Sequence, residues 1–241
     1  MLAAGGGGSF SPPPSVSVFY SPHQDDESLF MALAIANRVA AGDTVYVVCM
    51  TQGSTSAIFG LLNGTGGVCS WHGVTHNFGL SSGQFIAARD AEFAAACGVL
   101  SATNETAASR PDSGALTQAF AESTMRAYAT LYPNARHATI SWRDVHPDHI
   151  ACGNALKALV TANDVPTTRA KFYLRNEQQA GNAGTMEDNA LAATAIAALE
   201  EYKVYVPGSG RYGIGYHSVP TLMDAQLAGP FNKWHTAEQN P

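Results

Sequence analysis

The sequence carries few charged side chains for its length, which excludes several classes of protein. Asp, Glu, Lys and Arg make up 13% of the 241 residues, and the formal net charge is −6. Proteins that bind the phosphate backbone of nucleic acids normally carry an excess of basic residues. We therefore expect no nucleic-acid partner. Since 46% of the residues are hydrophobic, the composition is that of a globular chain rather than a disordered one.

Long apolar runs are also missing. None approaches the roughly 18 residues of a membrane-spanning helix, so we expect no transmembrane segment. Residues 1–14 are rich in Gly, Pro and Ser and lack the basic start and apolar stretch of a signal peptide. We interpret residues 1–14 as a disordered leader. The expected location is cytoplasmic, with secretion after removal of a signal as the alternative.

Cysteine is scarce, and its four positions have no CxxC spacing of the kind that binds zinc. Cys49, Cys97 and Cys152 lie in apolar runs and are predicted to be buried thiols. Cys69 lies in a loop and would pair with Cys97 only in a secreted protein. Free thiols are therefore the expectation.

The hydrophobic pattern predicts an α/β fold. Residues 16–20 alternate like a strand, 27–41 have helical periodicity, and 44–50 form a strand that is apolar on both faces, as in parallel sheets. We predict a single Rossmann-like domain over residues 15–241, with three α/β/α layers and a mostly parallel sheet. Further helices are expected at 84–97, 115–132, 147–162 and 186–202, and further strands at 137–142 and 171–174.

Two segments are predicted to be irregular. Residues 54–83 form a Gly-rich stretch without clear periodicity, and loops of this length are usually functional. Residues 205–241 are rich in Gly, Pro and aromatic residues. We expect the second segment to form a wall of the substrate site.

Two clusters of polar residues follow predicted strands. Residues 21–27 (SPHQDDE) place one imidazole beside three carboxylates, and residues 146–149 (HPDH) repeat the design before another helix. Each motif alone is often only a helix cap. Because both follow strands, they should meet at the carboxyl edge of one sheet. A catalytic zinc ion is typically held by three protein ligands, and two imidazoles and one carboxylate from these motifs would leave its fourth position open. One further carboxylate and one further imidazole then remain to act as base and electrophile.

These motifs resemble those of the LmbE-like/PIG-L zinc-dependent N-deacetylases. That family has a first motif of the form (A/S)-(H/P)-H-P-D-D-(E/D) and commonly H-P-D-H as its second. Thr51–Gly53 resembles the family's T-x-G after the second strand, and Arg89–Glu92 its R-x-x-E helix. Gln24 stands where proline is usual. The resemblance extends over residues 16 to about 160 and is weak in the tail.

The resemblance implies zinc, or another divalent metal, held by three ligands: His23, Asp26 and His149. It further implies that Asp25 is the base that deprotonates the attacking water. His146 would stabilise the oxyanion or protonate the leaving amine, and Asp148 would orient His146.

Four further residues are candidate substrate contacts: Arg89, Trp71, His72 and His217. Arg89 is either such a contact or the ion-pair partner of a site acid. Trp71 and His72 either line the substrate wall, where an aromatic face stacks on a sugar, or merely pack. The remaining histidines at 76, 137 and 235 are interpreted as structural or surface residues.

The leading hypothesis is a zinc-dependent hydrolase that removes an N-acetyl or other N-acyl group from an amino-sugar glycoconjugate. The long loop favours a bulky glycoconjugate over a free monosaccharide. A nucleotide-binding Rossmann oxidoreductase or transferase is the first alternative, although the turn after the first strand lacks G-x-G-x-x-G. A non-catalytic, metal-stabilised binding protein is the second. The sequence predicts neither the oligomeric state nor the particular amino sugar.

Overall fold

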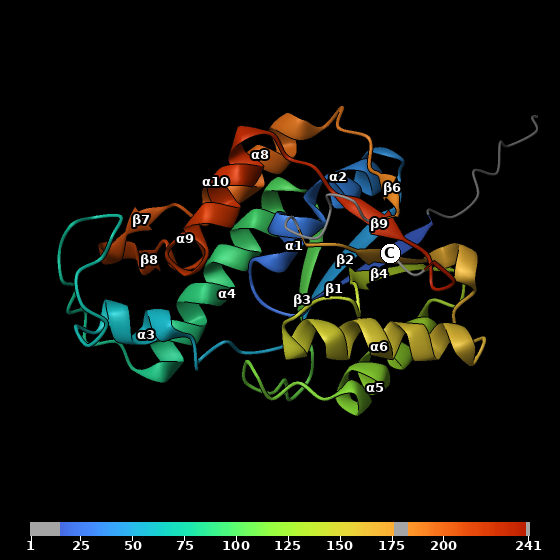
Figure 1. The fold of residues 1–241 in the computed structure, drawn as a ribbon, viewed down its shortest axis with the longest axis horizontal. Helices are drawn as coiled ribbons and strands as arrows, with labels where there is room; N and C mark the ends of the chain where they lie inside the picture. Colours follow the sequence, from blue (N-terminus) through green and yellow to red (C-terminus); the bar gives the residue numbers. More distant parts are fainter. Residues whose placement is uncertain (1–14, 176–182, 240–241) are drawn as a thin grey trace, which may run out of the picture.

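The computed structural model describes residues 15–175 and 183–239, and the predicted leader 1–14 lies outside the described residues. A seven-stranded sheet forms the centre of the fold (Figure 1). Its strands are β1 (Val16–Ser21), β2 (Thr44–Cys49), β3 (Thr103–Thr106), β4 (Arg136–Ile140), β5 (Ala170–Tyr173), β6 (Thr185–Met186) and β9 (Lys233–His235).

The strand order is β3-β2-β1-β4-β5-β9-β6. The first five strands pair in parallel, and β9 joins β5 and β6 antiparallel. The chain progresses outward from β1 to β3 and then returns to place β4 on the other side of β1. The switch point between β1 and β4 is where open α/β sheets bind ligands.

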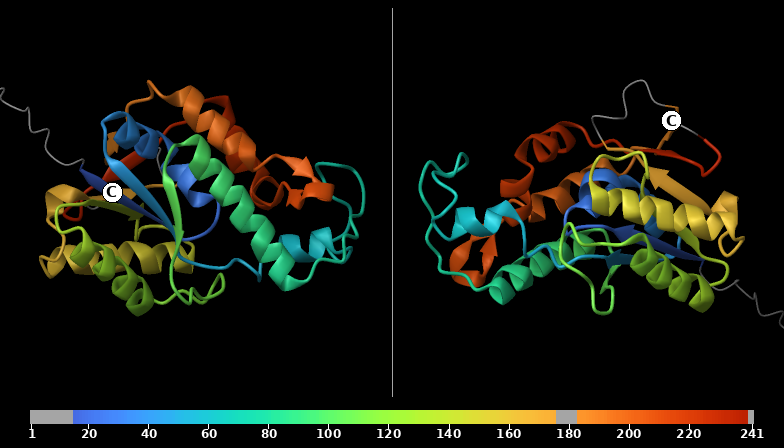
Figure 2. Two further views of the ribbon diagram at one scale, coloured as in Figure 1. Left: turned by 180° about the vertical axis from the view of Figure 1, so that it is seen from behind. Right: turned by 60° about the horizontal axis from the view of Figure 1, so that its bottom comes forward.

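Helices cover both faces of the sheet, which confirms the predicted three-layer fold (Figure 2). One face carries α5 (Gln118–Leu131) and α6 (Pro147–Thr161); the other carries α1 (Asp26–Phe30), α2 (Ala32–Ala40), α4 (Ser82–Val99), α8 (Ala192–Glu201) and α10 (Pro220–Ala228). Successive residues of β1 alternate between the two cores: Val18 and Tyr20 pack with α5 and α6, and Phe19 packs on the opposite side.

The helix predicted at 27–41 is interrupted. Met31 leaves helical geometry with φ −132° and ψ −1°, which separates α1 from α2. The side chain of Asn232, which precedes β9, accepts a hydrogen bond from the backbone N–H of Leu33 at 2.8 Å. A distant residue thus satisfies an N–H in the first turn of α2.

The prediction that residues 205–241 are irregular is wrong. They contain β7 (Tyr205–Val206), β8 (Arg211–Tyr212), α9 (Ile214–Ser218), α10 and β9. The strands and α9 have two to five residues, and α10, which has nine, carries no clear apolar face, so the sequence pattern does not mark these elements. The predicted helix 186–202 is likewise shorter, because Met186 belongs to β6. Strand β3 lies between the helices predicted at 84–97 and 115–132, where the sequence pattern predicts no element.

A small lobe lies beside the main layers, at the left of Figure 1. It consists of α3 (Ala57–Leu62), the loop that leads to α4, the β7–β8 hairpin and α9, all against the first half of α4. Its own apolar cluster includes Leu62, Phe85 and Ile214. The stretch predicted as one long loop therefore contains a helix and a hydrophobic centre. Over the described parts of the chain, no helix is long and apolar enough to cross a membrane.

Candidate metal centre

Both polar motifs meet at the switch point, as the sequence predicts. The first motif begins at Ser21, the last residue of β1. The second motif begins at His146, the N-cap of α6, shortly after β4 ends. Because β1 pairs directly with β4, the two turns lie side by side. They line a pocket of about 410 Å³.

Three side-chain atoms from the two motifs form a near-equilateral triangle. Asp26 Oδ2 lies 3.1 Å from His23 Nδ1 and 3.1 Å from His149 Nε2. His149 Nε2 lies 3.2 Å from His23 Nδ1. Tetrahedral zinc with bonds of about 2.0–2.1 Å holds its ligand atoms about 3.3 Å apart. The triangle therefore has the dimensions of three ligands of one zinc ion, and all three residues line the pocket.

Each imidazole of this triangle has a carboxylate behind it. Asp148 Oδ2 lies 2.9 Å from His23 Nε2, and Asp144 Oδ2 lies 3.1 Å from His149 Nδ1. Such outer carboxylates fix the orientation and tautomer of metal-binding histidines. No motif in the sequence singles out Asp144. The arrangement is recognisable only once α6 is placed against the end of β4.

The predicted role of Asp148 is not the one its side chain has here. Its carboxylate contacts His23 and accepts hydrogen bonds from the backbone N–H groups of Gly114 and Leu116 at 2.6 and 3.2 Å. The backbone N–H of Asp148, not its carboxylate, contacts His146. Asp148 thus orients His146 through its main chain, because the cap position of His146 directs its ring back over the first turn of α6.

The site concentrates buried negative charge. Asp25, Asp26, Asp144 and Asp148 are each at most 5% exposed. Burial raises the pKa of Asp25 to about 6, a shift that Arg89 opposes. Burial alone would raise the pKa of Asp26, but His149 and His23 hold it well below its usual range. Carboxylates at this density and depth require a neighbouring cation.

The same buried carboxylates change the pKa of His149. Burial alone would lower its pKa, but Asp26 and Asp144 raise the pKa to about 10. The pocket thus favours a positive charge at this point, either a proton or a metal ion.

Asp25 is the acid of the first motif that stands outside the triangle. Arg89 Nη2 lies 3.7 Å from Asp25 Oδ2, and Arg89 Nη1 donates to the carbonyl of Gly53 at 3.4 Å. Gly53 has φ +75°, and a Cβ there would lie 2.7 Å from Arg89 Nη1. Only glycine leaves room for the guanidinium at this distance. The T-x-G and R-x-x-E segments therefore cooperate in holding Asp25.

His146 lines the pocket beside the triangle. Its ring centroid lies 4.7 Å from that of His23 and 5.0 Å from that of His149. Its Nδ1 accepts the backbone N–H of Asp148 at 3.2 Å. In the neutral ring the proton is then on Nε2, which makes Nε2 a hydrogen-bond donor.

The predicted substrate contacts separate into two groups. Arg89 lines the pocket. Trp71, His72 and His217 are not among its lining residues, and their rings pack on one another in the small lobe. The prediction that these three contact the substrate is therefore not supported by their positions. The sequence interpretation named no residue at three other lining positions: Thr55, Ser113 and Arg175. Ser218, Val219 and Leu222 also line the pocket and belong to residues 205–241, the segment expected to form a wall of the substrate site.

Glu27 has a larger structural role than beginning a helix. It is fully buried, and Oε1 accepts hydrogen bonds from the hydroxyls of Tyr202 at 2.6 Å and Ser28 at 2.7 Å. Burial raises the pKa of Glu27 to about 8. The last acid of the motif thus connects α1 to the end of α8.

This fold and site define a three-layer α/β protein with a cluster of potential metal ligands at the sheet's switch point. The PIG-L family model, described as GlcNAc-PI de-N-acetylase, matches residues 18–160. The chain therefore belongs to the PIG-L family. Among curated proteins, no sequence matches it significantly.

Three solved structures illustrate the likeness. A triple mutant of a deacetylase of the teicoplanin biosynthetic pathway aligns with a TM-score of 0.64 at 15% identity, over 94% of this chain and 100% of the other. The 4-carboxy-2-hydroxymuconate hydratase of Pseudomonas putida aligns with 0.61 at 14% identity, over 94% and 98%. The N,N'-diacetylchitobiose deacetylase of Pyrococcus horikoshii aligns with 0.59 at 13% identity, over 93% and 84%. At these identities the likeness establishes the fold.

Proposed function

We propose that the protein is a zinc-dependent deacetylase that hydrolyses the N-acyl bond of an amino-sugar conjugate. The observation that carries the proposal is the triangle of His23 Nδ1, Asp26 Oδ2 and His149 Nε2 with sides of 3.1, 3.1 and 3.2 Å, with Asp25 and His146 beside it in one pocket. A purely metal-holding site has no need of these two additional groups.

The three atoms of the triangle would hold the metal. A zinc ion there supplies Lewis-acid polarisation for the amide carbonyl and for the attacking water.

Asp25 acts as the general base. In the metal-free site burial raises the pKa of Asp25 to about 6, which makes this carboxylate more basic than an ordinary one and suits it to accept a proton from the attacking water. Arg89 limits the rise of this pKa and orients the carboxylate. As the carbon–nitrogen bond breaks, Asp25 returns the proton to the leaving nitrogen. The products are a free amine and a carboxylate such as acetate.

His146 stabilises the oxyanion. Because Nδ1 accepts the Asp148 backbone N–H, the proton on Nε2 is available to the tetrahedral oxygen. This arrangement favours oxyanion stabilisation over protonation of the leaving amine, since a neutral ring with one proton is a hydrogen-bond donor and a poor acid. Burial also lowers the pKa of His146, which keeps the ring neutral.

The pocket suits a substrate with both polar and apolar parts. Leu29, Phe30 and Leu222 supply apolar surface, and Ser113 and Arg175 supply polar groups. The family description and the chitobiose deacetylase both name N-acetyl amino sugars, which supports this substrate class.

The test is acyl release by the purified, zinc-loaded chain. The substrates are N-acetylglucosamine, N,N'-diacetylchitobiose and an N-acetylglucosaminyl phosphatidylinositol analogue, with acetate and primary amine measured separately. We expect both products in equal amounts and faster turnover of the conjugates. Asp25→Asn should lower kcat by roughly 10²-fold or more with unchanged zinc content. Asp224→Asn is the control, because that carboxylate is exposed and bonds only Tyr216 among the described contacts.

Two results would contradict the proposal. One is full activity in Asp25→Asn. The other is hydration of an unsaturated polycarboxylate without acyl release from any N-acyl sugar, since a hydratase shares the fold. Equal turnover of free N-acetylglucosamine and its conjugates would contradict the preference for large conjugates alone.

A further inference from the structure

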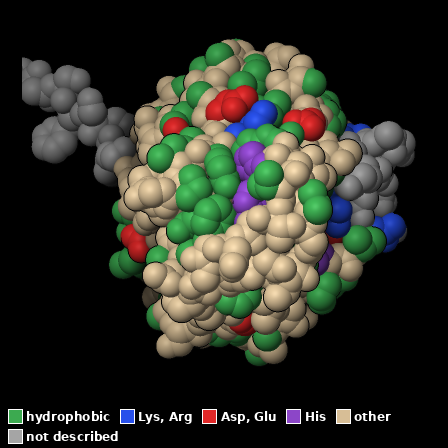
Figure 3. Space-filling model, turned by 90° about the vertical axis from the view of Figure 1, so that its left-hand side faces the viewer, with side chains coloured by type: hydrophobic (Ala, Val, Ile, Leu, Met, Phe, Trp, Pro, Cys, Tyr) green, Lys and Arg blue, Asp and Glu red, His purple; other side chains and the backbone are tan. Residues whose placement is uncertain are grey.

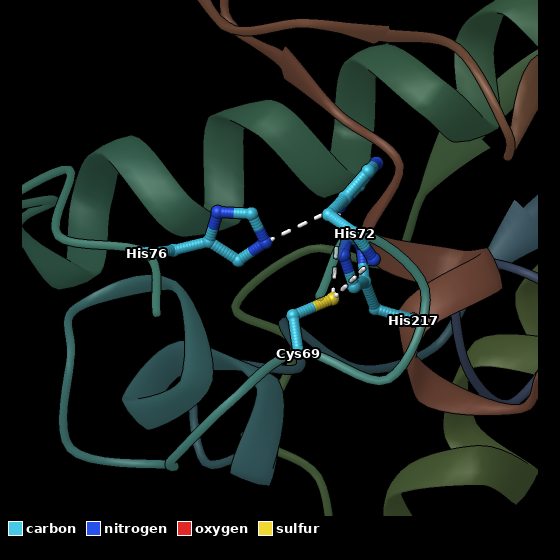
Figure 4. Close-up of side chains that lie close together, drawn as sticks. All are labelled: Cys69, His72, His76 and His217. Carbon is cyan, nitrogen blue, oxygen red and sulfur yellow. Dashed lines mark hydrogen bonds between the residues drawn. The ribbon is translucent and has the colours of Figure 1, made fainter. Parts of the chain in front are cut away.

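Four potential metal ligands meet in the small lobe, in a site separate from the pocket described above. Cys69, His72 and His76 come from the loop between α3 and α4, and His217 comes from α9 (Figure 4). Their ligand atoms all lie within 4.8 Å of one another. None of the four lines the catalytic pocket.

Two separations within the cluster match those of a tetrahedral zinc site. Cys69 Sγ lies 3.6 Å from His72 Nδ1, and His72 Nδ1 lies 3.3 Å from His76 Nε2. With bonds of about 2.3 Å to sulfur and 2.0–2.1 Å to nitrogen, a tetrahedral ion places sulfur about 3.5 Å from nitrogen and two nitrogens about 3.3 Å apart.

His217 is held in the form that binds metal. Its Nδ1–H donates to the carbonyl of Gly213 at 2.7 Å, which leaves Nε2 unprotonated. That Nε2 atom is buried and has no hydrogen-bond partner among the described residues. A buried acceptor without a partner is destabilising, and a metal ion bound there would remove that cost.

The other ligands have comparable support. The backbone N–H of His72 points at Cys69 Sγ at 3.4 Å, an interaction that favours the thiolate. His76 Nδ1 lies 3.3 Å from the hydroxyl of Tyr205, so its second nitrogen also has an outer partner. Cys69 and His76 are 1% and 4% exposed. Figure 3 views the molecule from the end where this lobe lies and shows histidine side chains at the surface among hydrophobic ones.

We propose that Cys69, His72, His76 and His217 bind a second zinc ion, which fastens the 63–81 loop to α9. Four protein ligands close the coordination sphere, as in structural zinc sites, and thiolate with imidazole favours zinc over magnesium or calcium. The sequence carries the spacing C-x₂-H-x₃-H at residues 69–76, which a search for CxxC overlooks. Because Ser218 follows His217 and lines the catalytic pocket, the second ion would also fix part of that pocket's wall.

Cobalt substitution distinguishes this site from the first. Thiolate bound to Co²⁺ gives an intense near-ultraviolet charge-transfer absorption, and the first site contains no cysteine. We expect the metal-free full-length chain to bind two equivalents of Co²⁺ and to develop this absorption. Cys69→Ser should bind one equivalent and lose the absorption. Asp26→Asn should keep the absorption while losing the first-site ion, so the result does not depend on the proposed activity.

Cys97→Ala is the matched control, because it removes a buried thiol that lies in the main core. It should retain both the absorption and two equivalents. Circular dichroism and a thermal melt of each variant show whether it folds. If Cys69→Ser does not fold, His72→Gln replaces it, with an expected loss of at least 10-fold in Co²⁺ affinity at the thiolate site. Wild-type protein saturated with Co²⁺ but without the absorption would overturn the proposal, as would an absorption that survives Cys69→Ser.

Discussion

His149 Nδ1 lies 3.1 Å from Asp144 Oδ2, on the side of the ring opposite the triangle of ligand atoms. A carboxylate in this position makes the imidazole more basic and fixes its orientation. Asp144→Asn should therefore weaken zinc affinity at the first site by roughly 10- to 100-fold. Competition with a chromophoric chelator measures the zinc affinity. Both proteins carry Cys69→Ser, which removes the proposed second site, so that only the first site binds zinc.

Asp164→Asn is the control for this measurement. Asp164 is an exposed aspartate near the end of α6 that pairs with Arg126. It should leave the affinity unchanged, because exposed ion pairs contribute little. Equal affinity in Asp144→Asn and wild type would show that the contact has no role in metal binding.

The contact between Glu27 and Tyr202 leads to a prediction about stability. Both side chains are fully buried, and the hydroxyl is 2.6 Å from the carboxyl oxygen. Tyr202→Phe removes one of the two hydroxyls that donate to Glu27 Oε1, and Ser28 keeps the other bond, so the free energy of unfolding should fall by about 0.5–1.5 kcal/mol in urea titrations. Tyr216→Phe, whose hydroxyl bonds Asp224 at the surface, should change it by less than about 0.5 kcal/mol. Similar effects for the two variants would contradict this assignment.

His137 predicts a dependence of stability on pH. It is 2% exposed, its Nδ1 is 2.9 Å from the hydroxyl of Tyr20, and burial lowers its pKa to about 4 from 6.5. The folded chain therefore binds fewer protons than the unfolded chain between these values. Stability should be complete above pH 6.5 and be lost as pH falls towards 4, by up to ~3 kcal/mol.

His137→Gln tests this dependence, since it keeps a hydrogen-bonding side chain but cannot titrate. The measurement is the difference between wild type and variant in unfolding free energy at pH 4.5 and 7. Both are measured without metal, so that protonation of the zinc ligands affects them equally. A pH-independent difference would mean that His137 is not the group responsible.

Gly153 sets how closely α6 approaches β4. A Cβ at this position would collide with the backbone nitrogen of Trp142 and lie 2.7 Å from the carbonyl carbon of Ser141. Gly153→Ala should destabilise the fold by about 1–3 kcal/mol and weaken zinc binding, because the displaced helix carries His149. Gly98→Ala in α4, with nothing within 4 Å, should be neutral or slightly stabilising. Unchanged stability and affinity in Gly153→Ala would contradict this packing argument.

The sequence predicts the site better than it predicts the lobe around it. Residues 21–27 and 146–149 are informative because strand ends in a parallel sheet must meet, so local patterns determine a long-range contact. Asp144 and Arg175 also follow parallel strands, β4 and β5, but no motif marks either residue, so the sequence does not single them out. The break at Met31 depends on Asn232, some 200 residues further along, which no local window contains. The C-terminal elements were missed because the strands and α9 are short and α10 carries no clear apolar face.

The two halves of the metal-binding triangle are far apart in the chain but lie on adjacent strands. Asp26 and His149 therefore come together only after β1 and β4 have paired, which requires closure of a loop of more than a hundred residues. If the triangle binds metal as proposed, uptake should be a late event in folding, and its rate should report when the central sheet is assembled. Once bound, the ion opposes separation of the two strands and so should slow unfolding of the whole domain.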